Sequence, residues 1–179
     1  MMKPLKVIAI IAFFMIVLLI GLRLIGFKSQ RYDDEAVSMQ PTLSAGDVCL
    51  SFMSQSWISG DIKEGMIVFL RHTNYNYLLT KRIIATEGET VFVNRDKTYV
   101  NGELLPEPYA YYSDSSLNLV TTDSIVVGKG KLFVMGDNRG NSMDSRYPEF
   151  GLVDLQDVVG RPLVILRSEN GAKFLKLLF

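Results

Sequence analysis

The feature that most constrains the fold of this chain is a long apolar stretch near its amino terminus. Residues 7–22 form an unbroken run without a charged side chain. A helix over this run alone would be about 24 Å long, shorter than a hydrocarbon core of roughly 30 Å. A helix over residues 5–27 would be about 34 Å long, with Lys6 and Arg23 near its ends, where long basic side chains reach the headgroups. The stretch therefore predicts a single membrane-spanning anchor over residues 1–28.

A cleavable secretory signal peptide is the alternative interpretation of this stretch. The apolar run is long for such a segment, and residues 23–27 contain no small-x-small pattern at which a leader would be cut. We therefore favour a permanent anchor. Basic residues lie on both sides of the run, so charge alone does not decide its orientation.

The remaining residues, 29–179, are enough for one domain with a core of its own. Lys and Arg together count 19, as do Asp and Glu, so the net charge is zero and no basic patch suggests a nucleic-acid partner. Cys49 is the only cysteine, which excludes an intramolecular disulfide and a cysteine-based metal site. Since its neighbours are apolar, we expect Cys49 to be a buried small side chain.

Beyond a short polar linker expected over residues 28–37, the chain has the pattern of a β-rich domain. Short runs of β-branched and aromatic residues alternate with turn residues, and no long amphipathic helix is evident after the anchor. The pattern predicts a mostly antiparallel barrel or sandwich, with a small inserted β or loop region at about residues 90–130 and a loop over residues 106–125. The expected strands cover residues 48–52, 66–70, 77–80, 91–93, 98–100, 131–135 and 163–166.

The chain contains a single histidine, which limits any chemistry that uses a serine. A serine hydroxyl is a weak nucleophile and requires a base, for which histidine is the usual choice. His72 ends a strand-like run in a polar stretch, where we expect a solvated loop residue. A Ser-His-Asp triad is therefore not expected.

Lysine can replace histidine as the base when it is neutral, and Lys81 is the best candidate. An exposed lysine has a pKa of about 10.4, whereas burial without a carboxylate partner lowers it by up to about 3–5 units. In a strand, Lys81 shares its face with Leu79 and Ile83, an apolar setting that suits a neutral amine. The alternative is an edge-strand lysine whose charge stays in water.

The candidate nucleophile is Ser38, the first residue of a Ser-Met-Gln-Pro-Thr-Leu run shortly after the apolar stretch. Read alone, a serine at such a position is as readily a capping or turn residue. A third segment, from Gly136 to Arg146, reads Gly-Asp-Asn-Arg-Gly-Asn-Ser-Met-Asp-Ser-Arg. The order of the three segments behind an apolar stretch is more informative than any one of them.

Together, the segments at Ser38, Lys81 and Gly136 resemble the nucleophile, lysine and Gly-Asp-Asn-Arg boxes of type I signal peptidases. Asn101-Gly102 and the Glu-Pro-Tyr run that starts at Glu107 resemble the region between the last two boxes. The resemblance implies a β-rich catalytic core with a small extra β region. It also implies a membrane-anchored Ser/Lys endopeptidase that removes signal peptides from exported preproteins, in contact with membrane lipid and without a metal or organic cofactor.

The resemblance further assigns roles to individual residues. Ser38 corresponds to the nucleophile and Lys81 to the general base that it needs. The residues that correspond to supporting positions are Ser142, which would orient the lysine, Asp144 and Arg146, which would form a pair beside it, and Asp137 and Asn138, which would brace the loop.

Substrates of this family carry small residues at the first and third positions before the cut. Met39, Leu43 and Leu79 are the expected substrate-binding residues because they neighbour Ser38 and Lys81 in the sequence. An extended substrate is expected to add as a strand beside the lysine strand. Because exported preproteins are cut on the far side of the membrane, we expect a single-pass protein of the cell membrane with its catalytic domain on the extracytoplasmic side.

Three positions depart from the family pattern. Ala36 stands two residues before Ser38, where many members carry Ser, Thr or Gly, so a side-chain donor for an oxyanion is absent there. Residues 85–89 replace the usual Gly-x-Pro-Gly-Asp run, and Gly140 stands where the last box often has Asp. These departures bear on the shape of the cleft and leave the Ser/Lys pair intact.

Three alternatives remain open at this stage. A processing peptidase dedicated to a conjugation or secretion system would carry the same motifs and differ only in its substrates. Self-cleaving repressor-type proteases also use Ser and Lys in a β fold, but they lack an anchor and carry a DNA-binding segment. A membrane-tethered scaffold that binds peptides is disfavoured because every residue of the expected site is present.

Overall fold

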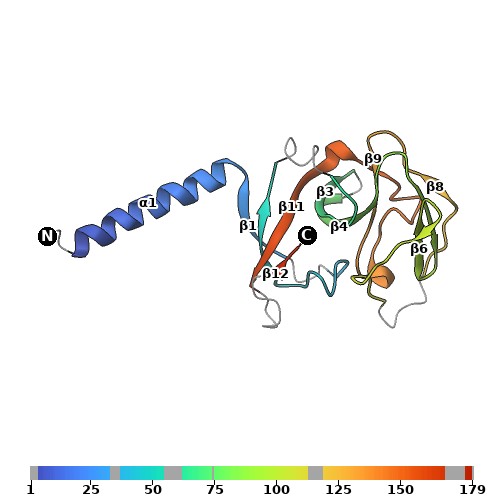
Figure 1. Cartoon of the computed structure of the whole chain (residues 1–179), viewed down its shortest axis with the longest axis horizontal. Helices are drawn as coiled ribbons and strands as arrows, with labels where there is room; N and C mark the ends of the chain where they lie inside the picture. The colour runs from blue at the N-terminus through green and yellow to red at the C-terminus, as the bar shows by residue number, and fades with distance from the viewer. Residues whose placement is uncertain are drawn as a thin grey trace.

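The computed structural model describes residues 4–32, 37–54, 62–73, 75–112, 119–167 and 176–178. Figure 1 shows helix α1 (Pro4–Leu24) projecting from one end of a β-rich body. Within it, residues Lys6–Leu24 have a mean hydropathy of 2.9, and none of this stretch is buried against the rest of the protein. A helix that is apolar on all sides and covered by none of the other described residues is suited to lipid, and α1 is long enough to cross a membrane.

Two antiparallel sheets make up the body. Among the described residues, the larger sheet has the strand order β1-β2-β11-β3-β4-β9-β10, with β12 paired to β11. The smaller sheet has the order β7-β6-β5-β8 and lies at the end of the body farthest from α1 (Figure 1). The mainly β, antiparallel fold predicted from the sequence is confirmed.

The strands of the larger sheet are β1 (Phe27–Arg31), β2 (Val48–Phe52), β3 (Ile67–His72), β4 (Tyr75–Ala85), β9 (Lys131–Met135), β10 (Val153–Asp154), β11 (Val158–Arg167) and β12 (Lys176–Leu177). The strands of the smaller sheet are β5 (Thr90–Asn94), β6 (Lys97–Val100), β7 (Glu103–Leu104) and β8 (Ile125–Val126). Two short 3-10 turns, η2 (Arg139–Asn141) and η3 (Leu155–Asp157), complete the described elements after α1.

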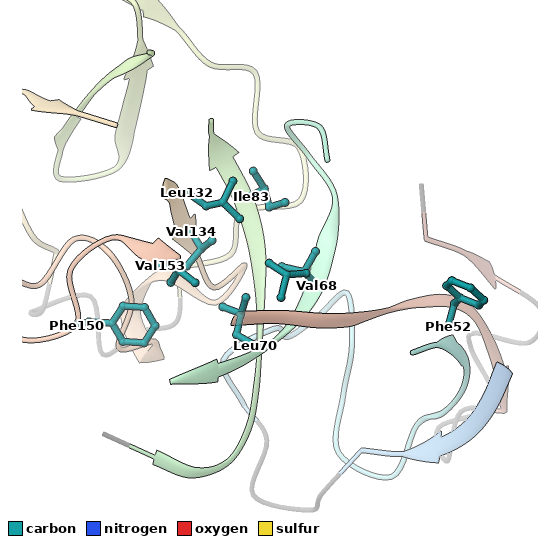
Figure 2. Close-up of a cluster of buried hydrophobic side chains, with 9 residues drawn as sticks. Phe52, Val68, Leu70, Ile83, Leu132, Val134, Phe150 and Val153 are labelled. Atoms are coloured by element: carbon teal, nitrogen blue, oxygen red, sulfur yellow. The ribbon is translucent and has the colours of Figure 1, made fainter. Parts of the chain in front are cut away.

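The main hydrophobic core packs against the middle of the larger sheet. Figure 2 shows side chains of β3, β4 and β9 grouped together, with Phe150 and Val153 joining them from the segment that follows β9. A second cluster joins Ile84 and Ala85 to the smaller sheet, and a third contains Cys49, which is buried as expected. Since β4 contributes to the first two clusters, its second half, residues 81–85, is buried.

The prediction of a polar linker over residues 28–37 is wrong for the first part of this range. Strand β1 begins almost directly after α1 and pairs with β2, Phe27 opposite Phe52, and the two rings lie 5.1 Å apart. An edge strand is stabilised by main-chain hydrogen bonds and leaves side chains in water, so a polar sequence such as that of β1 reads as a linker. The predicted division of the chain at residue 28 stays a prediction, and that residue lies within β1.

Strand β4 is longer than the expected run of residues 77–80, because the charged pair Lys81 and Arg82 interrupts the apolar pattern without ending the strand. His72, expected to be solvated, is half-buried at the end of β3. Its Nε2 lies 3.1 Å from the Phe150 carbonyl oxygen, and its ring stacks on that of Phe150. Aromatic packing across the β3–β4 hairpin therefore outweighs the polar character of the local sequence.

The smaller sheet, from Thr90 to Val126, corresponds to the β region predicted at about residues 90–130. The turn expected at Asn101 and Gly102 is confirmed, with positive φ angles of 52° and 85°. Of the loop predicted at residues 106–125, residues 113–118 lie outside the described part of the chain, and the described remainder is irregular until β8.

Candidate active site

Three segments meet beside the central part of β4. Strand β4 carries Lys81, the serine turn (residues 37–43) precedes β2, and the glycine loop (residues 136–146) follows β9. Because β9 pairs with β4, Arg82 opposite Met135, the glycine loop begins next to Lys81. The sheet topology thus brings together the three segments that the sequence analysis singled out.

Lys81 is a buried lysine with a hydroxyl as its hydrogen-bond partner. Its exposed fraction is 3%, and its Nζ donates to Ser142 Oγ over 3.0 Å. Burial disfavours the ammonium and lowers the pKa of Lys81 to about 8. The negative charges of Asp144 and Asp137 oppose this shift, and the positive charge of Arg146 adds to it. At pH 7 about a tenth of such lysines is neutral, as a general base must be.

Ser142 is fixed by a carboxylate that is itself held on both oxygens. Ser142 Oγ donates to Asp144 Oδ2 over 2.6 Å, which uses its single proton and leaves its lone pairs for Lys81. Arg146 donates from Nε to Asp144 Oδ1 over 2.7 Å and from Nη2 to Oδ2 over 2.9 Å. The main-chain N–H of Gly136 also donates to Asp144 Oδ2. The structure thus joins these sequence-predicted residues in one buried chain of hydrogen bonds.

The charge of Asp144 is well compensated. Burial alone would raise the pKa of this carboxyl group. The adjacent Arg146 guanidinium, the charge of Lys81 and the Ser142 hydroxyl outweigh burial, and the pKa lies below its ordinary value. Asp144 is therefore ionised at neutral pH, and it orients Ser142 as a fixed acceptor for Lys81.

Ser38 is held by its main chain. Its carbonyl oxygen accepts from the N–H of Asn138 over 3.0 Å, and Asn138 Nδ2 donates to the Val37 carbonyl oxygen over 3.2 Å. A Cβ at Gly136 would lie 2.5 Å from the Ser38 carbonyl oxygen and 2.3 Å from Ser142 Oγ. The serine turn and Ser142 are therefore in close contact across Gly136, where the space admits no side chain.

The structure brings Ser38 to the same site as Lys81 without a direct bond between them. Lys81 donates to Ser142 and makes no hydrogen bond to Ser38 within the part of the chain that the structure describes. The Ser38 side chain is half-buried and thus within reach of solvent. Ala36, which bears on the oxyanion donor, lies outside the described residues.

The three expected substrate-binding residues lie around this site at different depths. Met39 and Leu43, which belong to the serine turn, are buried in the cluster that contains Cys49. Leu79 is half-buried on β4, near the main core. Of the three, Leu79 alone is partly exposed, whereas Met39 and Leu43 are 1% and 0% exposed.

A buried ion pair that the sequence analysis did not identify ties the three segments together. Arg82, the neighbour of Lys81, donates from Nε and Nη2 to the two oxygens of Asp137, over 2.8 and 2.6 Å. Asp137 Oδ2 also accepts from Thr42 Oγ1 over 2.6 Å. The sequence predicted that Asp137 braces the loop, but it did not indicate that Arg82 and Thr42 bind this carboxylate. They lie 55 and 95 residues away from it in the sequence, so only the fold brings them together.

A second buried pair, Arg139 with Glu107, lies on the other side of the glycine loop. Both residues lie in segments that resemble those of the family, but the sequence assigned a role to neither of them. The Tyr109 ring lies close to these pairs, with the Arg82 guanidinium carbon 4.0 Å from its centroid. Several charged residues around the site are thus buried and paired, as a dry site requires.

Comparisons with known proteins give a consistent result. Residues 7–166 match the family described as "Signal peptidase, peptidase S26". The chain is 35% identical to a signal peptidase I of Bacillus licheniformis, over 81% of this chain and 80% of that protein. It is 36% identical to signal peptidase I T of Bacillus subtilis strain 168, over 81% and 77% of the two chains.

A relative from another genus has similar coverage. Signal peptidase IB of Staphylococcus aureus strain N315 is 32% identical, over 87% of this chain and 84% of that protein. Among solved structures, a signal peptidase I from Enterococcus faecalis V583 matches with a TM-score of 0.46 and 30% identity, over 56% of this chain and 96% of that chain.

Proposed function

The chain belongs to the signal peptidase family, peptidase S26, and on this premise we propose that it is a membrane-anchored serine endopeptidase that cuts signal peptides from exported preproteins after small residues. In this proposal Ser38 is the nucleophile and neutral Lys81 is the general base. The names of the relatives support the activity, and α1 supports the anchor. The observation that carries the assignment of the base is the burial of Lys81 against Ser142, with a pKa lowered to about 8.

Acylation uses the lone pair of the neutral lysine. A neutral amine has two N–H bonds and one lone pair, and one N–H donates to Ser142 Oγ. The lone pair accepts the proton of the Ser38 hydroxyl as Ser38 Oγ bonds to the carbonyl carbon of the scissile peptide. The tetrahedral intermediate collapses, the Lys81 ammonium returns the proton to the leaving amine, and an ester to Ser38 remains.

Deacylation repeats the same proton transfers with water. Lys81 takes a proton from a water molecule that attacks the ester carbonyl, and the proton then passes to Ser38 Oγ as the acid product leaves. A single oxyanion donor is worth about 2.7–4 kcal/mol in such reactions. Residue 36 offers no side-chain donor. The Ser38 main-chain N–H, which makes no hydrogen bond to another described residue, is our candidate donor.

An unpaired strand edge supports the binding of an extended substrate. The pairing of β9 with β4 is confined to Arg82–Ala85, so the Tyr75–Lys81 part of β4 has no partner strand on that side among the described residues. A peptide added along this edge would run past Leu79 to Lys81. In this proposal the small residues before the cut lie between the half-buried Leu79 and the serine turn, whose Met39 and Leu43 side chains are buried and support the turn from within.

The experiment that tests this proposal is cleavage of a purified preprotein by the full chain in detergent micelles. The wild type should cut after small residues, and Ser38→Ala and Lys81→Met should lose cleavage at least about a thousandfold while staying folded. Lys97→Met is the matched control, since Lys97 is exposed on the smaller sheet. Full activity of Lys81→Met would remove Lys81 as the base, and a folded wild type that cuts no preprotein would favour a dedicated substrate or a scaffold.

A further inference from the structure

A short segment from the smaller sheet supports the glycine loop from behind. This segment, the strap (residues 107–111), follows β7 and runs alongside residues 137–139. The N–H of Tyr111 donates to the Asp137 carbonyl oxygen over 2.7 Å, and the N–H of Arg139 donates to the Tyr111 carbonyl oxygen over 2.8 Å. The strap and the glycine loop are therefore joined by two well-formed main-chain hydrogen bonds.

A buried ion pair locks this contact. Nη1 and Nη2 of Arg139 both donate to the Glu107 carboxylate, Nη1 over 2.9 Å. Arg139 is 1% exposed, and its Nη1 also lies 3.4 Å from Thr98 Oγ1. A two-fold bond between buried groups fixes orientation as well as distance. Arg139 is thus held from the smaller sheet through the strap residue Glu107.

The same arginine fixes the point where Ser38 and Ser142 meet. Arg139 Nε donates to the Gly136 carbonyl oxygen over 3.1 Å. Gly136 is the position at which an added Cβ would strike both the Ser38 carbonyl oxygen and Ser142 Oγ. Any movement of Gly136 therefore changes the distance between the serine turn and the lysine side of the site.

Residues 137–139 are held by the strap on one side and hold Ser38 on the other. The N–H of Asn138 donates to the Ser38 carbonyl oxygen. Its two neighbours make the main-chain hydrogen bonds to the strap residue Tyr111, Asp137 through its carbonyl oxygen and Arg139 through its N–H. The Tyr109 ring lies 4.0 Å from the guanidinium carbon of Arg82 and 5.9 Å from that of Arg139, so it fills the space between the two buried pairs. The path from the smaller sheet to Ser38 is continuous.

We propose that Glu107 and Arg139 are positioning residues for Ser38: the strap fixes residues 136–139, and these set the place of the Ser38 main chain opposite Lys81. This inference rests on the proposed function, in which Ser38 is the nucleophile. Lys81 is held by Ser142 and Asp144, which meet this path at Gly136, where the main-chain N–H donates to Asp144 Oδ2. Because Arg146 also holds Asp144 on both oxygens, we expect the strap to act on the nucleophile and to leave the base unchanged.

The test is Glu107→Gln in the full chain in micelles, compared with the matched change Glu103→Gln at an exposed position of β7. A misplaced reacting group costs on the order of 10- to 100-fold in rate. We expect kcat to fall by this factor in Glu107→Gln. KM should stay within about twofold of the wild-type value, and the pH midpoint of the rate should stay within about 0.3 pH units of the wild-type midpoint. Glu103→Gln should match wild type in all three quantities.

A second readout does not depend on activity. Hydrogen exchange by mass spectrometry should show faster exchange in Glu107→Gln at peptides covering residues 136–142 and 37–43, by roughly tenfold, and no change at β3. This measurement decides the structural part of the proposal even if the wild type cuts no preprotein. In that case the proposed function fails and the role of the strap is still tested.

A paired variant guards against loss of the fold. Glu107→Gln leaves the Arg139 charge buried without a carboxylate, whereas Glu107→Leu with Arg139→Met removes both charges, a replacement that proteins often tolerate. The double variant also loses the bond to Gly136, so its kcat should fall as in Glu107→Gln. Unchanged kcat or unchanged exchange in a folded variant would overturn the proposal, and so would a loss of kcat accompanied by a shifted pH midpoint.

Discussion

Lys81 is held by side chains and Ser38 by main chain, and this contrast divides the candidate site into two halves. On the lysine side, Ser142, Asp144 and Arg146 are buried and connected by side-chain hydrogen bonds. On the serine side, the Ser38 side chain is half-buried, and its carbonyl oxygen accepts from the Asn138 N–H.

The two halves differ because they meet different physical requirements. Lys81 acts as a base near neutral pH chiefly because it lies in a dry place, since desolvation is the largest cause of its lowered pKa. A nucleophile must instead be open to a substrate, so its side chain cannot be enclosed by partners. The site therefore fixes the base through its side chain and the nucleophile through its backbone.

The largest effect should come from breaking the lysine side at its carboxylate. Asp144→Asn leaves Arg146 buried without its negative partner, which typically costs about 3–5 kcal/mol. We expect a Tm lower by roughly 6–20 °C, measured by thermal unfolding in micelles. In the fraction that is folded, the pH midpoint of cleavage should fall, because the Asp144 charge raises the pKa of Lys81.

The exposed pair Lys131 and Asp154 supplies the control for this prediction. Asp154→Asn makes the same chemical change at a partly exposed site, where ion pairs contribute little. A pH midpoint that rises in Asp144→Asn, or a Tm loss no larger than that of Asp154→Asn, would contradict the assigned structure of the lysine side.

The next effect has the opposite sign for stability. The pKa of Lys81 is about 8 in the folded protein and about 10.4 when unfolded, so the unfolded chain binds more protons between these values. The burial of Lys81 therefore costs stability. The cost is fully present below pH 8, decreases as the pH rises from 8 to about 10.4, and is absent above that. Lys81→Met should remove this cost of about 3 kcal/mol and lose about 1 kcal/mol with the hydrogen bond to Ser142. The free energy of unfolding should therefore rise by about 2 kcal/mol.

Thermal unfolding at pH 7 checks this prediction. Lys81→Met should unfold at a higher temperature than wild type, by roughly 4–8 °C, although it cuts nothing. The gain should shrink at pH 10, and Lys97→Met should show no gain at either pH. A Tm below that of wild type at pH 7 would mean that Lys81 is not buried at a cost to stability.

Gly136→Ala attacks the point where the two halves meet. The new Cβ would lie within 2.6 Å of three atoms, including the Ser38 carbonyl oxygen and Ser142 Oγ, so the serine turn has to move away. We expect a loss of stability of about 1–3 kcal/mol and a fall in kcat of about 100-fold. Gly128→Ala, whose nearest contact is a flexible lysine side chain at 3.8 Å, is the matched control. Equal behaviour of the two variants would exclude the close packing at Gly136.

The smallest effect should come from the serine side alone. Asn138→Ala removes the side-chain bond to the Val37 carbonyl oxygen and keeps the main-chain bond to Ser38. We expect a loss of about 1 kcal/mol in stability and a decrease in kcat of about fivefold, with KM and the pH midpoint unchanged. Steady-state kinetics over pH measures all three. A shift of the pH midpoint would show that the two halves are not separable.

How much of this arrangement is visible in the sequence differs between the halves. Lys81 stands among apolar residues with strand alternation, and Ser142, Asp144 and Arg146 lie within a short and specific run, so the residue types alone suggested the lysine side. The pairs of Arg82 with Asp137 and of Arg139 with Glu107 join residues 55 and 32 positions apart, and no local pattern indicates such partners.

The fold shows the same limit. The apolar runs of β2, β3 and β9 predicted strands near their observed positions, because burial on a sheet requires such residues. The polar strand β1 was missed, since main-chain pairing in place of side-chain burial determines it. The run expected for β4 ended at residue 80, because the charged pair Lys81 and Arg82 interrupts the apolar pattern. His72 was misjudged for a related reason, because its partner Phe150 is distant in sequence.

The pH dependence of single-turnover cleavage by the full chain decides whether Lys81 acts as a buried and neutral base. We expect a rate that rises with pH, reaches half its maximum near pH 8 and levels off above it, with about a tenth of the enzyme active at pH 7. Lys97→Met should follow the same curve. A rate that is constant from pH 6 to about 9, or that reaches half its maximum near a histidine value of about 6.5, would contradict it.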